Sequence, residues 1–158
     1  GGSGWGDASV AEYAASRDDW DVLSLAIGTN SYRGERESAQ DFRVTYDRFL
    51  EIVRGTHPQC PILCITPIWR AQDADGARNR YGDRIQDYRE AIQRVVADRQ
   101  AADPHLYGLD GLSLIGEDRG LVLDRVHPDD HGMVRIAQGV TCAWKAIERP
   151  PPLAGAGV

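Results

Sequence analysis

The sequence is poor in features that mark several large classes of protein. Lys145 is its one lysine among 18 basic residues, and the net charge is −6. No basic cluster for binding nucleic acid is therefore expected. No apolar run reaches the length of about 18 residues that a membrane-spanning helix needs, so a membrane span is excluded. The 158 residues are 42% hydrophobic, which is enough for the core of one globular domain.

Cysteine is also scarce. Three cysteines cannot form a complete disulfide framework, and no pair has the spacing of a zinc ribbon or knuckle. Cys60 and Cys64 flank an expected strand, and Cys142 lies in the apolar stripe of an expected helix. We therefore expect all three cysteines to be buried and to act as small hydrophobic residues. No metal or organic cofactor is predicted. No secretion signal is recognisable, and the cellular compartment stays open.

Short apolar runs alternate with amphipathic stretches along the chain. Apolar runs predict strands at 21–27, 61–66 and 106–109. Helical periodicity predicts helices at 7–17, 38–54, 82–101 and 129–147. Gly55 is expected to end the second of these helices, and 67–80 is expected to be a polar loop.

Strands separated by helices of this length are typical of βαβ units. We therefore predict a three-layer α/β/α, flavodoxin-like domain with a parallel sheet over residues 1–148. Residues 149–158 are rich in proline and glycine and are predicted to be a flexible tail. Sites in such sheets gather at the carboxyl ends of the strands, so chemistry is sought in the segments that follow them.

The segment ahead of the last predicted helix reads Asp124-Arg125-Val126-His127-Pro128. An Asp and a His three residues apart can meet on one turn, where the carboxylate orients the ring through Nδ1 and leaves Nε2 free. Such a pair supplies two members of a nucleophilic triad, the general base and the carboxylate that orients it. Histidine suits the role of base because its unperturbed pKa of about 6.5 allows proton transfer near neutrality. The same residues also suit the start of a helix with an exposed histidine.

The segment Gly28-Thr29-Asn30 follows the first predicted strand. A side-chain amide at Asn30 can donate a hydrogen bond to an oxyanion, and Gly28 lets the backbone turn closely beneath it. A plain strand-to-loop turn also favours glycine and asparagine.

The chain opens on a glycine-rich run at residues 1–6. Backbone N–H groups in such a turn can also donate to an oxyanion. A flexible linker has a similar composition. The run is no dinucleotide-binding fingerprint, since no strand precedes it.

Two other features bear on a site. Trp69, in the loop after the second predicted strand, is either a substrate contact or one buried tryptophan in a solvated loop. His127 and His131 are four residues apart, but Pro128 lies between them and no third ligand is near, which argues against a metal site.

Taken in order, these features resemble the SGNH (GDSL-type) hydrolase family. The likeness covers nearly the whole chain, from the glycine-rich turn to the closing helix. The sequence motif typical of the family is Leu109-Asp110-Gly111, followed by Asp124-x-x-His127-Pro128-x-x-x-Gly132.

The resemblance implies a role for each site residue. His127 is the general base, Asp124 orients it, Asn30 is the side-chain oxyanion donor, and Gly2, or else Gly4, is the backbone donor. It implies a serine esterase that cleaves a small-molecule carboxylic ester through an acyl-enzyme, with no cofactor. The alternatives are an acyltransferase with the same triad and a catalytically incomplete remnant that binds an ester or glycan.

The sequence departs from the family pattern at two places. Ser31 stands where the family has aspartate after Asn30, and we count Ser31 and Trp69 as candidate substrate-binding residues. The Gly-Asp-Ser-Leu motif, which carries the nucleophilic serine at the end of the family's first strand, is missing. None of the seven serines follows a strand in that way.

Three explanations remain for the missing nucleophile. An upstream segment outside this chain supplies the serine, or the chemistry has been lost, or Ser3 or Ser31 has taken over. Loss of a central strand leaves two rows of unpaired backbone groups. We therefore expect a companion N-terminal segment or a rearranged homodimer.

Overall fold

The structure is a computed structural model that describes residues 4–117 and 120–148. Its sheet has three parallel strands in the order β1-β2-β3. The strands are β1 (Leu23–Leu25), β2 (Ile62–Ile65) and β3 (Leu106–Leu109). All three predicted strands are present, although β1 is shorter than the predicted 21–27. The tail at 149–158, Gly2 and Ser3 lie outside the described residues.

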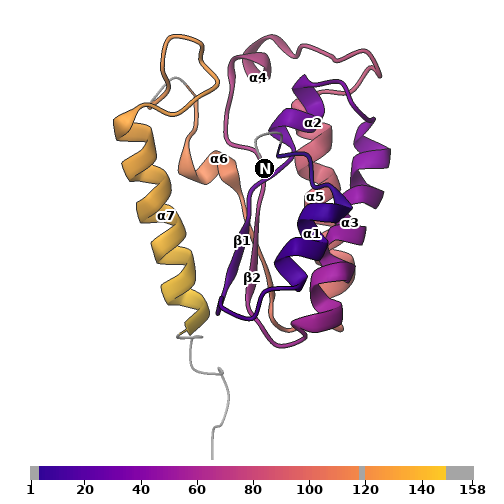
Figure 1. Ribbon diagram of the computed structural model, residues 1–158. Coiled ribbons are helices and arrows are strands. Elements are labelled where there is room, and N and C mark those ends of the chain that lie inside the picture. Colours follow the sequence, from indigo (N-terminus) through magenta and orange to yellow (C-terminus); the bar gives the residue numbers. More distant parts are fainter. Residues whose placement is uncertain (1–3, 118–119, 149–158) are drawn as a thin grey trace, which may run out of the picture.

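Helices lie on both sides of the sheet (Figure 1). One side carries α1 (Ala8–Ala15), α3 (Ala39–Thr56) and α5 (Ile85–Gln100). The other side carries α6 (Gly111–Leu114) and α7 (Asp130–Glu148). Two short helices, α2 (Thr29–Arg33) and α4 (Ala71–Asp75), follow β1 and β2. The predicted α/β/α architecture with a parallel sheet is confirmed. None of the described helices is long and apolar enough to cross a bilayer.

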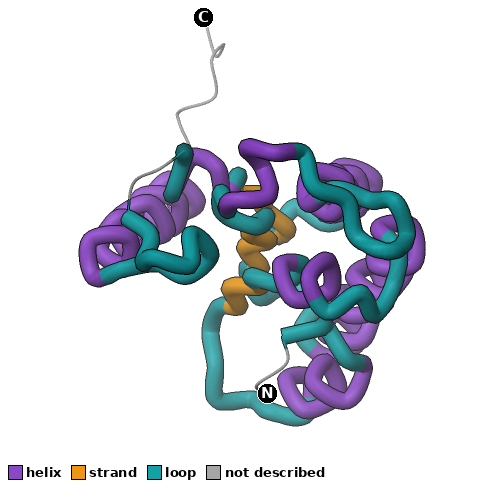
Figure 2. Tube along the Cα trace, turned by 90° about the horizontal axis from the view of Figure 1, so that it is seen from above, coloured by secondary structure: helices purple, strands orange, loops and turns teal. Residues whose placement is uncertain are grey.

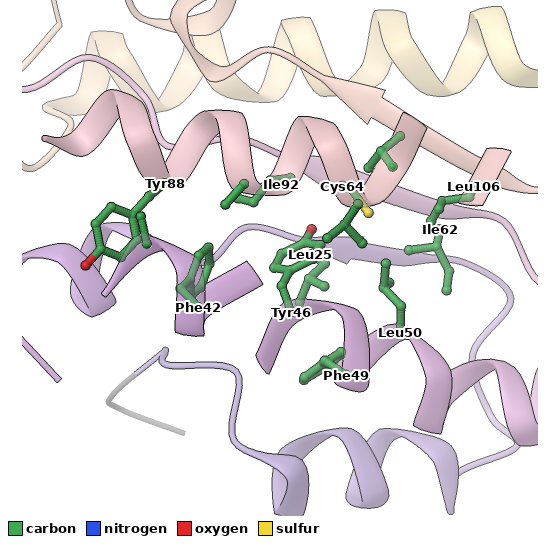
Figure 3. Close-up of a cluster of buried hydrophobic side chains, with 14 of the residues drawn as sticks. Leu25, Phe42, Tyr46, Phe49, Leu50, Ile62, Cys64, Tyr88, Ile92 and Leu106 are labelled. Carbon is green, nitrogen blue, oxygen red and sulfur yellow. The ribbon is translucent and has the colours of Figure 1, made fainter. Parts of the chain in front are cut away.

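Strand β2 is buried on both faces, as its unbroken apolar sequence predicts. Successive side chains of a strand point to opposite faces, so Ile62 and Cys64 pack toward α3 and α5, and Leu63 and Ile65 pack toward α7. Figure 3 shows the first of these clusters, in which aromatic rings from α3 and α5 interdigitate. Burial raises the pKa of the Cys64 thiol to about 11, so this cysteine is an inert core residue.

The α7 side of the sheet is packed more loosely. Gly132 is the one buried residue of α7, while Ile136, Val140 and Trp144 are half-buried against β2. Met133, near the start of α7, is 56% exposed. The outer edge of β1 pairs with no strand in the described part of the chain.

Three other expectations are wrong. Helix α3 continues through Gly55 to Thr56, and the N–H of His57 still bonds to the carbonyl of Val53. The loop at 67–80 contains the short helix α4. Cys142 is exposed. It lies two residues from Val140 and two from Trp144, which pack toward the sheet. Two residues along a helix correspond to a rotation of about 200°, so Cys142 faces the opposite side.

Candidate active site

A cavity of about 390 Å³ lies at the carboxyl ends of the strands. Asn30 and Arg33 of α2, Trp5 ahead of α1, and Asp124 and His127 ahead of α7 contribute to its wall. Figure 2 looks down on this end of the sheet, where the connecting loops meet. The structure therefore brings three of the residues predicted from the sequence, His127, Asp124 and Asn30, to one cavity.

Asp124 and His127 form a close pair. The Nδ1 of His127 lies 2.5 Å from the Oδ2 of Asp124. The other carboxylate oxygen, Oδ1, accepts the backbone N–H groups of Val126 and His127 at 2.8 and 2.9 Å. These hydrogen bonds, with that to the His127 ring first, lower the pKa of Asp124 to about 2. The carboxylate is thus ionised at neutral pH and is fixed toward Nδ1, which leaves Nε2 for a proton transfer.

A narrow loop holds this pair in place. The backbone N–H of Val122 donates to the carbonyl of His127 at 2.9 Å, and Leu121 forms an antiparallel bridge with Pro128. At the base of the loop, a Cβ on Gly132 would lie 2.0 Å from the carbonyl oxygen of Gly120, so a side chain there is excluded. The glycine five residues after His127 therefore lets the first turn of α7 pack directly on the loop.

Trp69 supports this loop from behind. Its side chain is buried, and the guanidinium of Arg125 lies 5.2 Å from the ring centroid. The carbonyl of Arg125 also accepts the N–H of Ala71 at 2.9 Å. Trp69 does not line the cavity. The alternative of a buried tryptophan therefore fits the structure, and a substrate contact by Trp69 stays a prediction.

Asn30 is presented by a tight turn at the end of β1. Gly28 has φ +118, and a Cβ there would lie 3.2 Å from Pro67 and 3.3 Å from Phe42. Only a residue without a side chain fits this approach. Asn30 is the second residue of the short helix α2, at the cavity wall.

The glycine-rich opening meets Asn30 at Gly4. Gly4 has φ +55, and a Cβ on it would lie 3.4 Å from the Nδ2 of Asn30. The Gly4 backbone and the Asn30 amide are therefore neighbours, as two donors to one oxyanion must be. Gly2, the first choice from the sequence, lies outside the described residues.

Ser31 faces away from the cavity. It is fully buried, and its hydroxyl donates to Oε1 of Glu37 at 3.3 Å. The other oxygen of Glu37 accepts the hydroxyl of Thr45 at 2.7 Å. The Ser31 hydroxyl is therefore engaged inside the protein and does not line the cavity, and its role as a substrate contact stays a prediction. None of the described serines lines the cavity, and Ser3 lies outside the described residues.

Sequence reasoning missed two residues of the cavity wall, Trp5 and Arg33. Arg33 lies three residues after Asn30, which on a helix places the two on the same face. That spacing was the signal available for Arg33, and the position directly after Gly4 was the signal for Trp5.

The described residues, 4–117 and 120–148, contain no group of three or more His, Cys, Asp or Glu side chains that could hold a metal ion. The pair His127 and His131 has no third ligand there.

The sequence profile of the GDSL-like Lipase/Acylhydrolase family matches residues 2–135. No curated protein matches the chain significantly in sequence.

Several solved structures share the fold. A salicylyl-acyltransferase from a tetracycline biosynthetic pathway is 25% identical, with a TM-score of 0.78 over 95% of this chain and 44% of its own. A carbohydrate esterase of family 3 from Talaromyces cellulolyticus is 18% identical, with a TM-score of 0.71 over 92% of this chain and 68% of its own. A peptidoglycan O-acetylesterase is 17% identical, with a TM-score of 0.72 over 91% of this chain and 42% of its own. The chain thus spans less than half the length of two of these proteins.

Proposed function

The chain belongs to the GDSL-like lipase/acylhydrolase family, and on that premise we propose that its cavity is the base and oxyanion part of a serine esterase site. The substrate is a small-molecule carboxylic ester. The observation that carries the proposal is the Asp124–His127 pair, joined at 2.5 Å, in the same cavity as Asn30.

The proposed reaction follows from the chemistry of these groups. A serine hydroxyl attacks the ester carbonyl carbon while Nε2 of His127 takes its proton, and Asp124 stabilises the imidazolium that forms. The carbonyl oxygen becomes an oxyanion, to which the Asn30 amide and the Gly4 N–H donate. His127 then returns the proton to the leaving alcohol as the carbon–oxygen bond breaks. Water hydrolyses the acyl-serine by the same steps, with His127 again as base.

We further propose that a companion segment supplies the nucleophilic serine. Among residues 4–117 and 120–148 no strand pairs with the outer edge of β1, and such an edge is a template for another strand. The half-buried side chains of α7 offer apolar surface beside the sheet for such a strand to cover. A second copy of this chain, paired edge to edge, is the alternative, and analytical ultracentrifugation of the purified chain separates the two.

An acyltransferase is the second candidate function. The observation that favours it is the similarity to the salicylyl-acyltransferase, at 25% identity. Hydrolysis and transfer use the same triad and differ in whether water or an acceptor hydroxyl resolves the acyl-enzyme. Partition of a labelled acyl group between water and an added alcohol distinguishes them.

Labelling with a fluorophosphonate, followed by intact mass, tests the proposal. An activated serine reacts, and the mass of the labelled species shows which polypeptide carries it. We expect a label that is lost in His127→Ala and kept in His131→Ala, which removes the exposed histidine four residues further on. The absence of label from every species would refute the esterase and favour an ester- or glycan-binding remnant.

A further inference from the structure

Arg33 is the cation of the cavity wall. Its side chain is exposed and forms no hydrogen bond or ion pair with any residue of 4–117 or 120–148. Arg36, three residues on, is instead paired with Asp7 at 2.5 Å. Asp124 is the one carboxylate in the described cavity wall, and it is bound to His127. No described side chain therefore neutralises the positive charge of Arg33, and an anion that enters the cavity can pair with it.

A second guanidinium, that of Arg70, is close enough to Arg33 for the two charges to interact. Arg70 is almost fully buried, its Nη1 lies 3.4 Å from the carbonyl of Thr29, and its Nη2 has no hydrogen-bond partner among the described residues. Burial lowers the pKa of Arg70 and the nearby charge of Arg33 lowers it further, while Tyr32 and Asp73 act in the opposite direction. The two guanidinium groups thus repel each other, and an anion beside Arg33 relieves that repulsion.

The indole ring of Trp5 lines the cavity together with Arg33. The guanidinium of Arg36 lies 4.9 Å from the Trp5 ring centroid. A Cβ on Gly34 would lie 3.4 Å from the indole nitrogen of Trp5, so the glycine lets the ring pack closely on the end of α2. The indole is therefore held between α2 and Arg36, beside the cation of Arg33.

We propose that Arg33 and Trp5 form a subsite for a carboxylate or similar anionic group of the substrate. Arginine presents paired N–H donors that match a carboxylate, and such charge-assisted hydrogen bonds are stronger than neutral ones. The preferred substrates are then esters that carry a negative charge a few bonds from the scissile carbonyl. This inference rests on the proposed function for the reaction itself, but the binding preference is independent of any serine.

A pair of uncleaved ester analogues tests the subsite by binding. N-phenylsuccinamic acid and N-phenylbutyramide have the same phenyl amide core, and the acid carries a carboxylate in place of the terminal methyl group. Dissociation constants are measured by NMR titration of the chain at low and high salt. We expect about tenfold tighter binding of the acid, weakened by salt. The preference disappears in Arg33→Gln and survives in part in Arg33→Lys.

The matched control is Arg94→Gln. Arg94 is an exposed arginine of α5 that does not line this cavity, so the variant removes the same charge elsewhere and keeps the preference. Equal affinities for the two analogues, no measurable binding of the acid, or a preference that survives Arg33→Gln would each overturn the subsite. Failure of fluorophosphonate labelling with the preference intact would refute the esterase and leave the subsite standing.

Discussion

Two loops of this protein each depend on a pair of oppositely charged or ionisable side chains, and the pairs differ in burial. The Asp124–His127 pair ahead of α7 is exposed, with 47% and 76% of the side chains accessible. The Asp73–Arg89 pair under the loop after β2 is buried, with 15% and 1% accessible. Arg89 also donates to the carbonyls of Pro67 and Ile68 at 2.7 and 2.8 Å.

Because the two pairs differ in burial, we expect one to contribute to the reaction and the other to the free energy of unfolding. An exposed pair contributes little to the free energy of unfolding, because water screens it, but a reactant can reach it. A buried pair that also bonds backbone carbonyls holds a loop in place, and loss of one partner leaves a charge without compensation. We therefore expect substitutions in the first pair to change rates without changing stability, and substitutions in the second to do the reverse.

His127→Ala gives the largest expected effect. It removes the base, so kcat of the complete enzyme should fall by about 10³-fold or more. The melting temperature should change little, because the side chain is exposed. Ester hydrolysis and a thermal melt of the same sample measure the two quantities, with His131→Ala as the control. Activity near wild type in His127→Ala would contradict the assignment.

Arg89→Met tests the buried pair. It leaves the Asp73 carboxylate unpaired and removes donors from two backbone carbonyls, so we expect the free energy of unfolding to fall by about 3–5 kcal/mol. Urea denaturation measures this change. Arg48→Met is the matched control, because Arg48 and Glu51 form an exposed pair that should contribute less than about 1 kcal/mol. Equal effects of the two substitutions would remove the distinction between the pairs.

Asn30→Ala sharpens the account of the exposed site. Loss of one oxyanion donor should lower kcat by about 10²–10³-fold. Steady-state kinetics separate kcat from KM. A rise in KM alone would make Asn30 a substrate-binding residue.

The smallest expected effect is a pH dependence of the Asp124 turn. The pKa of Asp124 is lowered from 3.8 to about 2, so the ionised form is favoured in the folded chain. The resulting stabilisation is fully present above about pH 4 and is lost as the pH falls through about 2. The backbone amide of His127, which donates to this carboxylate, reports the titration by NMR. A midpoint near 4 would show that the hydrogen bonds do not favour the carboxylate.

Local patterns in the sequence predicted much of the fold. The continuous apolar run of β2 and the helical spacing of Phe42, Tyr46 and Leu50 in α3 identified a buried strand and its covering helix, because period and burial are linked. The end of α3 at Thr56 and the helix α4 were missed, since tertiary contacts decide such boundaries. Cys142 was placed wrongly because the packed strip of α7 is narrower than its apolar composition implies.

In the candidate site too, local contacts could be predicted from the sequence and long-range contacts could not. The Asp124–His127 pair is local, three residues apart, so its hydrogen bond could be predicted from spacing alone. The approach of Gly4 to Asn30, and of Arg125 to Trp69, joins segments 26 and 56 residues apart. Such contacts depend on the whole fold. For that reason the sequence left the role of Trp69 open between a substrate contact and a buried tryptophan.

The central claim is that Asp124 holds His127 with Nε2 ready to accept a proton. The tautomer of the His127 ring, measured by long-range ¹H–¹⁵N NMR on the chain near pH 8, tests it most directly. The account predicts a neutral ring protonated on Nδ1, a state that is lost in Asp124→Ala. A ring protonated on Nε2, or a tautomer that Asp124→Ala leaves unchanged, would contradict it.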